Sequence, residues 1–190
     1  MKKLLTTLLC IGMMWVANGQ QLTGCMGVNF GSSTDQVKAI IGAKPGVELY
    51  TNTPETISYL NGKWGSRNCV GSIFKFYQNQ LHSIVILVEA PAKPQIMDLY
   101  NEIVNDLENK YGVSFIKSHN FKYPYEEGDG HEMTAIKGGY ATIASYVTLA
   151  DGNSMAVSIT ESLSVKVEYQ HAELIQKAID VQKENNNKDY

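Results

Sequence analysis

The sequence predicts an α+β domain in which helices cover one face of an antiparallel β-sheet. Three observations lead to this class. The segment 94–111 has the apolar spacing of an amphipathic helix, and 84–88 is a continuous apolar run typical of a central strand. The third is Asp151-Gly152-Asn153, a strong turn signal between two alternating apolar segments, which predicts a β-hairpin.

The first predicted helix begins after Ser33. Residues 33–36, Ser-Thr-Asp-Gln, form a capping box, in which the serine and glutamine side chains satisfy free backbone N–H groups. An apolar stripe follows, and the helix ends at Gly42. Strands are then expected at 56–60, 72–77 and 83–89, with a turn at 78–80 between the last two.

The second predicted helix, 94–111, carries the clearest apolar face in the chain, and Gly112 stands at its C-terminal capping position. The residues of this face are Ile96, Leu99, Tyr100, Ile103, Val104, Leu107 and Tyr111. Such a stripe must be buried, so the helix is expected to lie on the sheet.

The predicted hairpin consists of 139–149 and 155–169. In its second arm the large apolar residues all fall at odd positions, which predicts one long strand or two strands in the same register. They are Met155, Val157, Ile159, Leu163, Val165, Val167 and Tyr169. A final amphipathic helix begins at Ala172. We therefore expect one domain over 21–182, followed by a flexible polar tail over 183–190.

The order of elements indicates an internal duplication. A helix ending at Gly42 and a helix ending at Gly112 each precede a set of strands, and a glycine–aromatic segment recurs at 62–65 and 137–140. This predicts two α-β-β-β units that share one sheet.

The first twenty residues have the three parts of a signal peptide. Lys2 and Lys3 precede an apolar run from Leu4 to Ala17, and Asn18-Gly19-Gln20 forms a polar exit. The run is shorter than the roughly 20 residues that a membrane-spanning helix needs. We therefore expect cleavage near residue 20, an export to the periplasm or beyond the cell, and no transmembrane segment in the remaining chain.

Residues 22–25, Leu-Thr-Gly-Cys, match the pattern at which bacterial lipoproteins are cleaved and acylated on cysteine. A lipid anchor at Cys25 is therefore an alternative. Against it, four residues separate this pattern from the apolar run, and the domain begins at once after Cys25 with no tether.

The charge balance argues against a nucleic-acid partner. The full chain has 16 basic and 19 acidic residues, a net charge of −3, and loss of Lys2 and Lys3 makes the remainder more acidic still. Such a chain has little to offer a phosphate backbone.

Two of the three cysteines, Cys25 and Cys69, lie outside the predicted signal peptide. In an oxidising compartment they could form a disulfide, closing a loop of about 45 residues. The alternative is two buried thiols in neighbouring strands.

Several segments together carry a family resemblance: residues 25–32, Cys-Met-Gly-Val-Asn-Phe-Gly-Ser; residues 59–65, Tyr-Leu-Asn-Gly-Lys-Trp-Gly; and Lys-Tyr-Gly at 110–112. They resemble a group of small exported proteins of Bacteroides-type bacteria, similar in layout to the β-lactamase-inhibitor-protein-like fold of SmpA/OmlA-type lipoproteins. The resemblance implies an antiparallel sheet with helices on one side and the binding of other proteins.

No pattern in the sequence predicts catalysis or a cofactor. None of the four histidines has metal-ligand spacing, and a nucleophile elbow Gly-x-Ser-x-Gly is lacking. An acidic, glycine-containing loop over 126–132 offers Asp129 and Glu132 as weak candidates for calcium ligands. An envelope hydrolase or small-ligand protein using this loop is the alternative function.

Aromatic residues near predicted strand ends are the remaining candidates for binding. Tyr59, Trp64, Tyr123 and Tyr125 offer rigid contact area with a polar group, although they also suit the margin of a small core. The sequence thus favours a non-enzymatic binding module that contacts an envelope or extracellular protein through the exposed sheet face and the Trp64 and Tyr123–Tyr125 loops.

Overall fold

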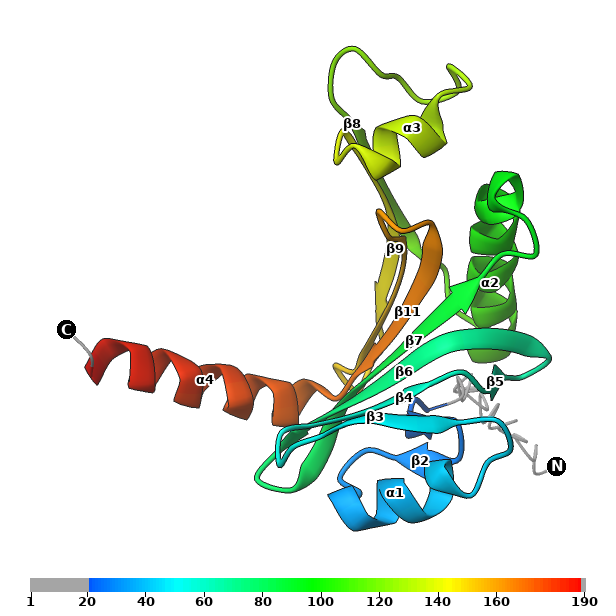
Figure 1. Ribbon diagram of the computed structural model, residues 1–190. Helices are drawn as coiled ribbons and strands as arrows, with labels where there is room; N and C mark the ends of the chain where they lie inside the picture. The colour runs from blue at the N-terminus through cyan, green and yellow to red at the C-terminus, as the bar shows by residue number, and fades with distance from the viewer. Residues whose placement is uncertain (1–20, 189–190) are drawn as a thin grey trace, which may run out of the picture.

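A computed structural model describes residues 21–188 of the chain (Figure 1). The predicted signal peptide, residues 1–20, lies outside the described residues. Among the described residues, no helix is both long and apolar enough to cross a membrane.

The α+β prediction is confirmed: within the described residues, nine strands form one antiparallel sheet. Eight of them follow the order β3-β4-β6-β7-β11-β10-β9-β8, and β5 pairs with β6 beside this path. The strands are β3 (Glu48–Asn52), β4 (Thr56–Leu60), β5 (Lys63–Trp64), β6 (Arg67–Tyr77), β7 (Gln80–Glu89), β8 (Ile116–Phe121), β9 (Ala141–Thr148), β10 (Ser154–Ile159) and β11 (Ser164–Gln170).

The helices are α1 (Thr34–Gly42), α2 (Ile96–Tyr111), α3 (Glu132–Lys137) and α4 (Ala172–Lys188), with a 3-10 turn over Lys93–Gln95. A separate hairpin of β1 (Gly24–Cys25) and β2 (Val28–Asn29) precedes α1. The predicted capping box is present, because the Ser33 and Gln36 side chains each accept a backbone N–H of the other residue. The predicted stop at Gly112 is also present: this residue has φ 65° and its N–H donates to the Glu108 carbonyl.

The chain consists of two halves with the same order of elements. α1 is followed by β3, β4, β6 and β7, and α2 is followed by β8, β9, β10 and β11. Each half lays its four strands side by side, and the last strands, β7 and β11, pair along Ser83–Glu89 and Ser164–Gln170. Each half therefore contributes four strands to the sheet, whereas three strands were predicted for each repeated unit.

The sequence did not predict β3 and β8 because they are the two edges of the sheet. Each has a neighbour on one side only, so both are polar and lack regular apolar alternation. The glycine–aromatic segments are not equivalent, contrary to the prediction: 62–65 lies between β4 and β6, whereas 137–140 precedes β9.

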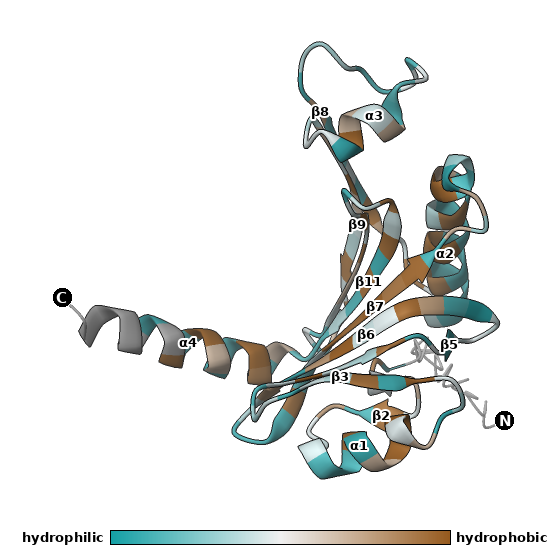
Figure 2. Ribbon diagram, in the orientation of Figure 1, coloured by the Kyte–Doolittle hydropathy of each residue, from teal (hydrophilic) through white to brown (hydrophobic). Residues whose placement is uncertain are grey.

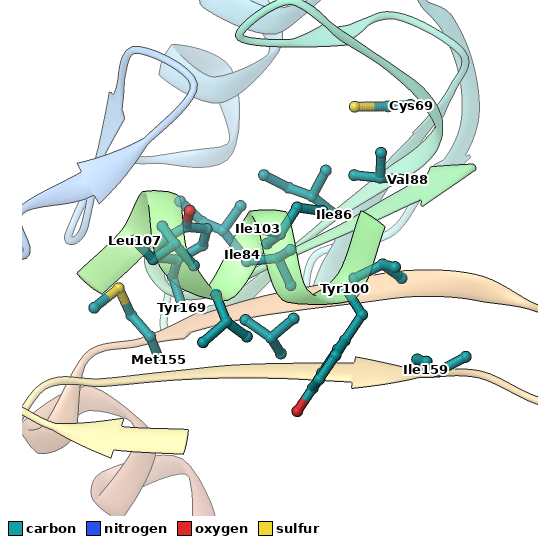
Figure 3. Close-up of a cluster of buried hydrophobic side chains, with 14 of the residues drawn as sticks. Cys69, Ile84, Ile86, Val88, Tyr100, Ile103, Leu107, Met155, Ile159 and Tyr169 are labelled. Atoms are coloured by element: carbon teal, nitrogen blue, oxygen red, sulfur yellow. The ribbon is translucent and has the colours of Figure 1, made fainter. Parts of the chain in front are cut away.

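One face of the sheet carries the core. Odd-numbered residues of β10 and β11 point to this face as predicted, and the turn at Leu163 separates two strands in the same register. α2 packs on β10 and β11. Ile103 and Leu107 lie near Ile84 and Tyr169, whereas Tyr100 extends across β10 toward Ser145 of β9 (Figure 3). Each aliphatic side chain buried in this way contributes about 1.5–3 kcal/mol. Val37 and Ile41 of α1 belong to the same core.

α4 departs from the predicted arrangement. It leaves the sheet on the side opposite α2 and points away from it (Figures 1 and 2), and of its described side chains only Leu174 is buried. It also continues to Lys188, past the predicted domain end at 182, so the tail predicted over 183–190 is helical as far as 188.

Asn153 joins three distant segments of the fold. Its Nδ2 donates to the Leu22 carbonyl at 3.1 Å, and its Oδ1 accepts the Ala172 N–H at 2.9 Å. Leu22 itself is 1% exposed and belongs to the core. The folded domain thus includes the chain from Leu22 onward and ties it to the start of α4.

We expect Asn153→Ala to destabilise the protein by about 2–3 kcal/mol, because two partners would lose hydrogen bonds in a buried position. Urea unfolding monitored by circular dichroism measures this change. Asn120→Ala is the matched control, since Asn120 is exposed and bonds only Ser118, and its effect should stay below about 0.5 kcal/mol. Equal losses in both variants would contradict the role assigned to Asn153.

Candidate binding cleft

A cleft of about 1040 Å³ opens where the two halves of the fold meet. Its walls are the β1–β2 hairpin, the turn after α1 at 44–46, the segment 62–65 and the C-terminal half of α2. Tyr169 of β11, which is paired with Ile84 at the centre of the sheet, also lines it. This cleft is large enough to admit a small organic molecule.

Trp64 reaches the cleft through a short hairpin. β5 pairs with the start of β6, Trp64 facing Arg67, so Gly65 and Ser66 form a two-residue turn. Gly65 has φ 62°, a conformation that glycine adopts without strain. A Cβ at Gly62 would lie 2.7 Å from the side chain of Val47, the residue before β3, so the start of this hairpin fits closely against that segment.

Trp64 is half-buried, and its indole Nε1 donates to the Cys25 Sγ at 3.3 Å. Arg67 lies over the indole ring, 6.0 Å from its centroid. The indole is therefore held on one side by the β1–β2 hairpin and on the other by a guanidinium. A fixed aromatic surface of this kind binds ligands at a low cost in entropy.

Both predicted disulfide partners are free thiols in the structure. They are not in neighbouring strands, because half-buried Cys25 lies in the β1–β2 hairpin and buried Cys69 lies in β6 of the large sheet. Burial raises the pKa of Cys25, although hydrogen bonds from Trp64 and Tyr169 oppose the rise. Burial and the neighbouring Cys25 raise the pKa of Cys69 to about 11. Neither group is therefore a thiolate at neutral pH, and both are poor nucleophiles.

Basic side chains surround the cleft. Lys44, Lys63, Arg67 and Lys110 line it, against a single carboxylate, Asp106. Arg67 binds Asp106 at 2.6 Å and also lies 3.8 Å from Glu102. The negative charge of Asp106 is therefore already balanced by Arg67.

Of the four predicted binding residues, Trp64 alone lies in this cleft. Tyr59 is 3% exposed and packs edge-on against Phe74 within the core, so its prediction as a binding residue is corrected. It sits at an inward position of β4, where the alternation of the strand requires an apolar side chain.

Tyr123 and Tyr125 lie on the long loop between β8 and α3, at the other edge of the sheet from β5 (Figure 1). Tyr123 is 94% exposed, whereas Tyr125 stacks at 5.5 Å on Tyr140. The structure therefore does not bring the Trp64 and Tyr123–Tyr125 sites together.

The carboxylates of the acidic loop bind the loop's own backbone. Asp129 accepts the N–H groups of Glu126 and His131, which lowers its pKa, and Glu132 accepts the N–H of Gly128 at 3.0 Å. Among the described residues, no group of three or more potential ligands is placed to hold a metal ion. The structure gives Asp129 and Glu132 a role in shaping the loop.

A buried polar network was not predicted from the sequence. Tyr100 of α2 bonds Ser145 of β9 at 2.5 Å and lies 3.4 Å from the His119 Nε2, while His119 Nδ1 lies 2.7 Å from Glu127. Ser145 is the one polar residue among the inward positions of β9. This polar residue in an apolar row is the sequence signal that could have indicated a buried hydrogen-bond network. The network ties the acidic loop to the sheet; Tyr100 and Ser145 are fully buried, so no substrate reaches them.

Leu22 bears on the predicted lipid anchor. Acylation at Cys25 requires cleavage just before it, which would remove Leu22 from the core and the Thr23 carbonyl that accepts the Phe30 N–H. Lipidation of Cys25 would therefore cost the domain the burial of Leu22 and this hydrogen bond.

Comparisons with protein-family models, curated proteins and solved structures find no match to the chain. The resemblance to exported Bacteroides-type proteins with an inhibitor-like layout remains a prediction.

The state of the cysteines is directly testable. We expect both to be alkylated only after unfolding at neutral pH, with no reductant needed, and the labelling rate of folded Cys69 to rise up to about pH 11 because only the thiolate reacts. Mass spectrometry of iodoacetamide-treated protein measures this. Ser162→Cys, at an exposed turn, supplies a control thiol that should react at neutral pH. A requirement for reduction before labelling would establish the disulfide instead.

Proposed function

We propose that this protein is a non-enzymatic binding module of the cell envelope or extracellular space, and that its ligand enters the cleft beside Trp64. The observation that carries the proposal is a half-buried indole, fixed by Cys25 and Arg67, on the wall of a cleft of about 1040 Å³. Export rests on the signal-peptide pattern of residues 1–20.

The chemistry of the cleft supports binding over catalysis. Its thiol, Cys25, has a raised pKa, so it is protonated at neutral pH. Among the described residues, those that line the cleft include neither histidine nor serine, and their one carboxylate, Asp106, is paired with Arg67. The cleft therefore lacks a general base beside a nucleophile, the pairing on which acyl-transfer chemistry depends.

We expect Trp64→Ala to lower ligand affinity at least about tenfold, the usual effect of truncating an anchoring aromatic residue. Native mass spectrometry of the protein purified from its own cell envelope would detect the bound species. Tyr50→Ala, at an exposed position on β3, is the control and should retain it. Circular dichroism verifies that both variants fold. Retention of the bound species by folded Trp64→Ala would contradict the proposal.

A second candidate is a protein partner at the β8–α3 loop. It is favoured by Tyr123, which is 94% exposed on a loop held by the Tyr125–Tyr140 stack and by the His119–Glu127 contact. An exposed aromatic residue on a positioned loop is a typical anchor at protein interfaces.

For this candidate we expect Tyr123→Ala to reduce, at least about tenfold, the crosslinking of one dominant partner in intact envelopes. Trp64→Ala should leave that crosslinking unchanged, because Trp64 lies in the other half of the sheet. The readout is mass spectrometry of the captured protein. Undiminished capture by Tyr123→Ala would rule out this loop as the anchor.

A further inference from the structure

The charges around the Trp64 cleft oppose the charge of the whole protein. The chain has a net charge of −3, yet four basic residues and one acidic residue line this cleft. Cations gathered in one concave place repel one another and concentrate an electric field there. That arrangement lowers the free energy of an anion in the cleft.

Three of the four cations are available to a ligand. Arg67 is committed to Asp106 and Glu102. In the part of the chain that the structure describes, Lys44, Lys63 and Lys110 form no ion pair. Lys63 and Lys110 are exposed, and Lys110 stands over the Tyr111 ring at 4.9 Å. Among the described residues, no carboxylate therefore competes with a bound anion for these ammonium groups.

The inner wall of the same cleft is apolar. The half-buried Trp64 ring offers a ligand apolar surface there, whereas the lining residues Leu107 and Tyr169, 3% and 1% exposed, add little to it. Burial against aromatic and aliphatic side chains favours an apolar group by about 25 cal/mol for each Å² that it removes from water. A molecule with an acidic group and an apolar body thus matches both parts of the site.

The size of the cleft favours a small molecule over a protein surface. Small-molecule sites are concave and enclose about 300–1,000 Å³, and this cleft, at about 1040 Å³, is slightly larger than the top of that range. A stable protein contact instead needs about 800 Å² of matching surface on each partner.

We infer that the Trp64 cleft binds a small anionic amphiphile, with its apolar body against the Trp64 ring and its acidic group toward Lys44, Lys63 and Lys110. This inference rests on the proposed function and specifies its ligand class.

Decanoate and 1-decanol test the inference, since they share a chain length and differ in charge. The protein is prepared from residue 21 onward, so that Trp64 is its single tryptophan, because the other, Trp15, lies in the predicted signal peptide. Occupancy of the cleft is measured as protection of Trp64 fluorescence from acrylamide quenching. We expect decanoate to bind at least about tenfold more tightly than 1-decanol at low salt, and this preference to shrink as salt is added.

Charge reversal at the cleft isolates the role of the lysines. We expect Lys63→Glu combined with Lys110→Glu to weaken decanoate binding at least about tenfold and to leave 1-decanol binding unchanged. Lys117→Glu combined with Lys137→Glu makes the same change of charge at exposed positions in the other half and should leave both affinities unchanged.

The outcomes separate this inference from the proposed function. Protection of Trp64 by both probes with equal affinity, or undiminished decanoate binding after charge reversal at the cleft, would overturn the anionic preference and leave the cleft as a binding site. Failure of both probes to protect Trp64 would overturn the inference. If, in addition, no species bound in the native envelope depended on Trp64, the proposed function would fall as well.

Discussion

The antiparallel pairing of β7 with β11 joins the two halves of this protein, and most of the fold depends on it. The pairing runs from Ser83–Gln170 to Glu89–Ser164 without a bulge, and it places Ile84, Ile86 and Val88 on the same face as Tyr169, Val167 and Val165. Because side chains alternate between faces, a shift of one residue would turn one of these apolar rows away from the core. The apolar inward face of both strands therefore fixes the register.

The cleft follows from the same pairing. Tyr169 lies in β11 of the second half, and Trp64 in the hairpin that leads into β6 of the first half. Leu107 and Lys110 come from α2, which connects the halves, and Cys25 comes from the hairpin before α1. No local segment contains the site, so its charge and shape exist only when both halves have folded onto one sheet.

The halves differ most where segments were inserted. In the first half a short turn over 53–55 links the two outer strands, whereas in the second half the corresponding connection runs over 122–140 and contains α3. The polar chain from Ser145 through Tyr100 and His119 to Glu127 holds this longer connection to the sheet. The first half instead contains β5, which carries Trp64. The two aromatic sites thus lie in segments that the two halves do not share.

The sequence alone determined the elements whose signals are local or periodic. The Ser33 capping box, the Gly112 stop, the apolar stripe of α2 and the odd-numbered rows of β10 and β11 each depend on neighbouring residues or on a fixed spacing, so the α+β class could be derived from them. Trp64 could be singled out as an aromatic residue near a strand end, but Tyr59 had the same signature and lies in the core. Only the tertiary structure decided between them, because exposure depends on which distant strands and helices cover a side chain. For the same reason it alone brought Lys44, Lys63, Arg67 and Lys110 to one cleft, and revealed the edge strands, whose polar sequences carry no periodic signal.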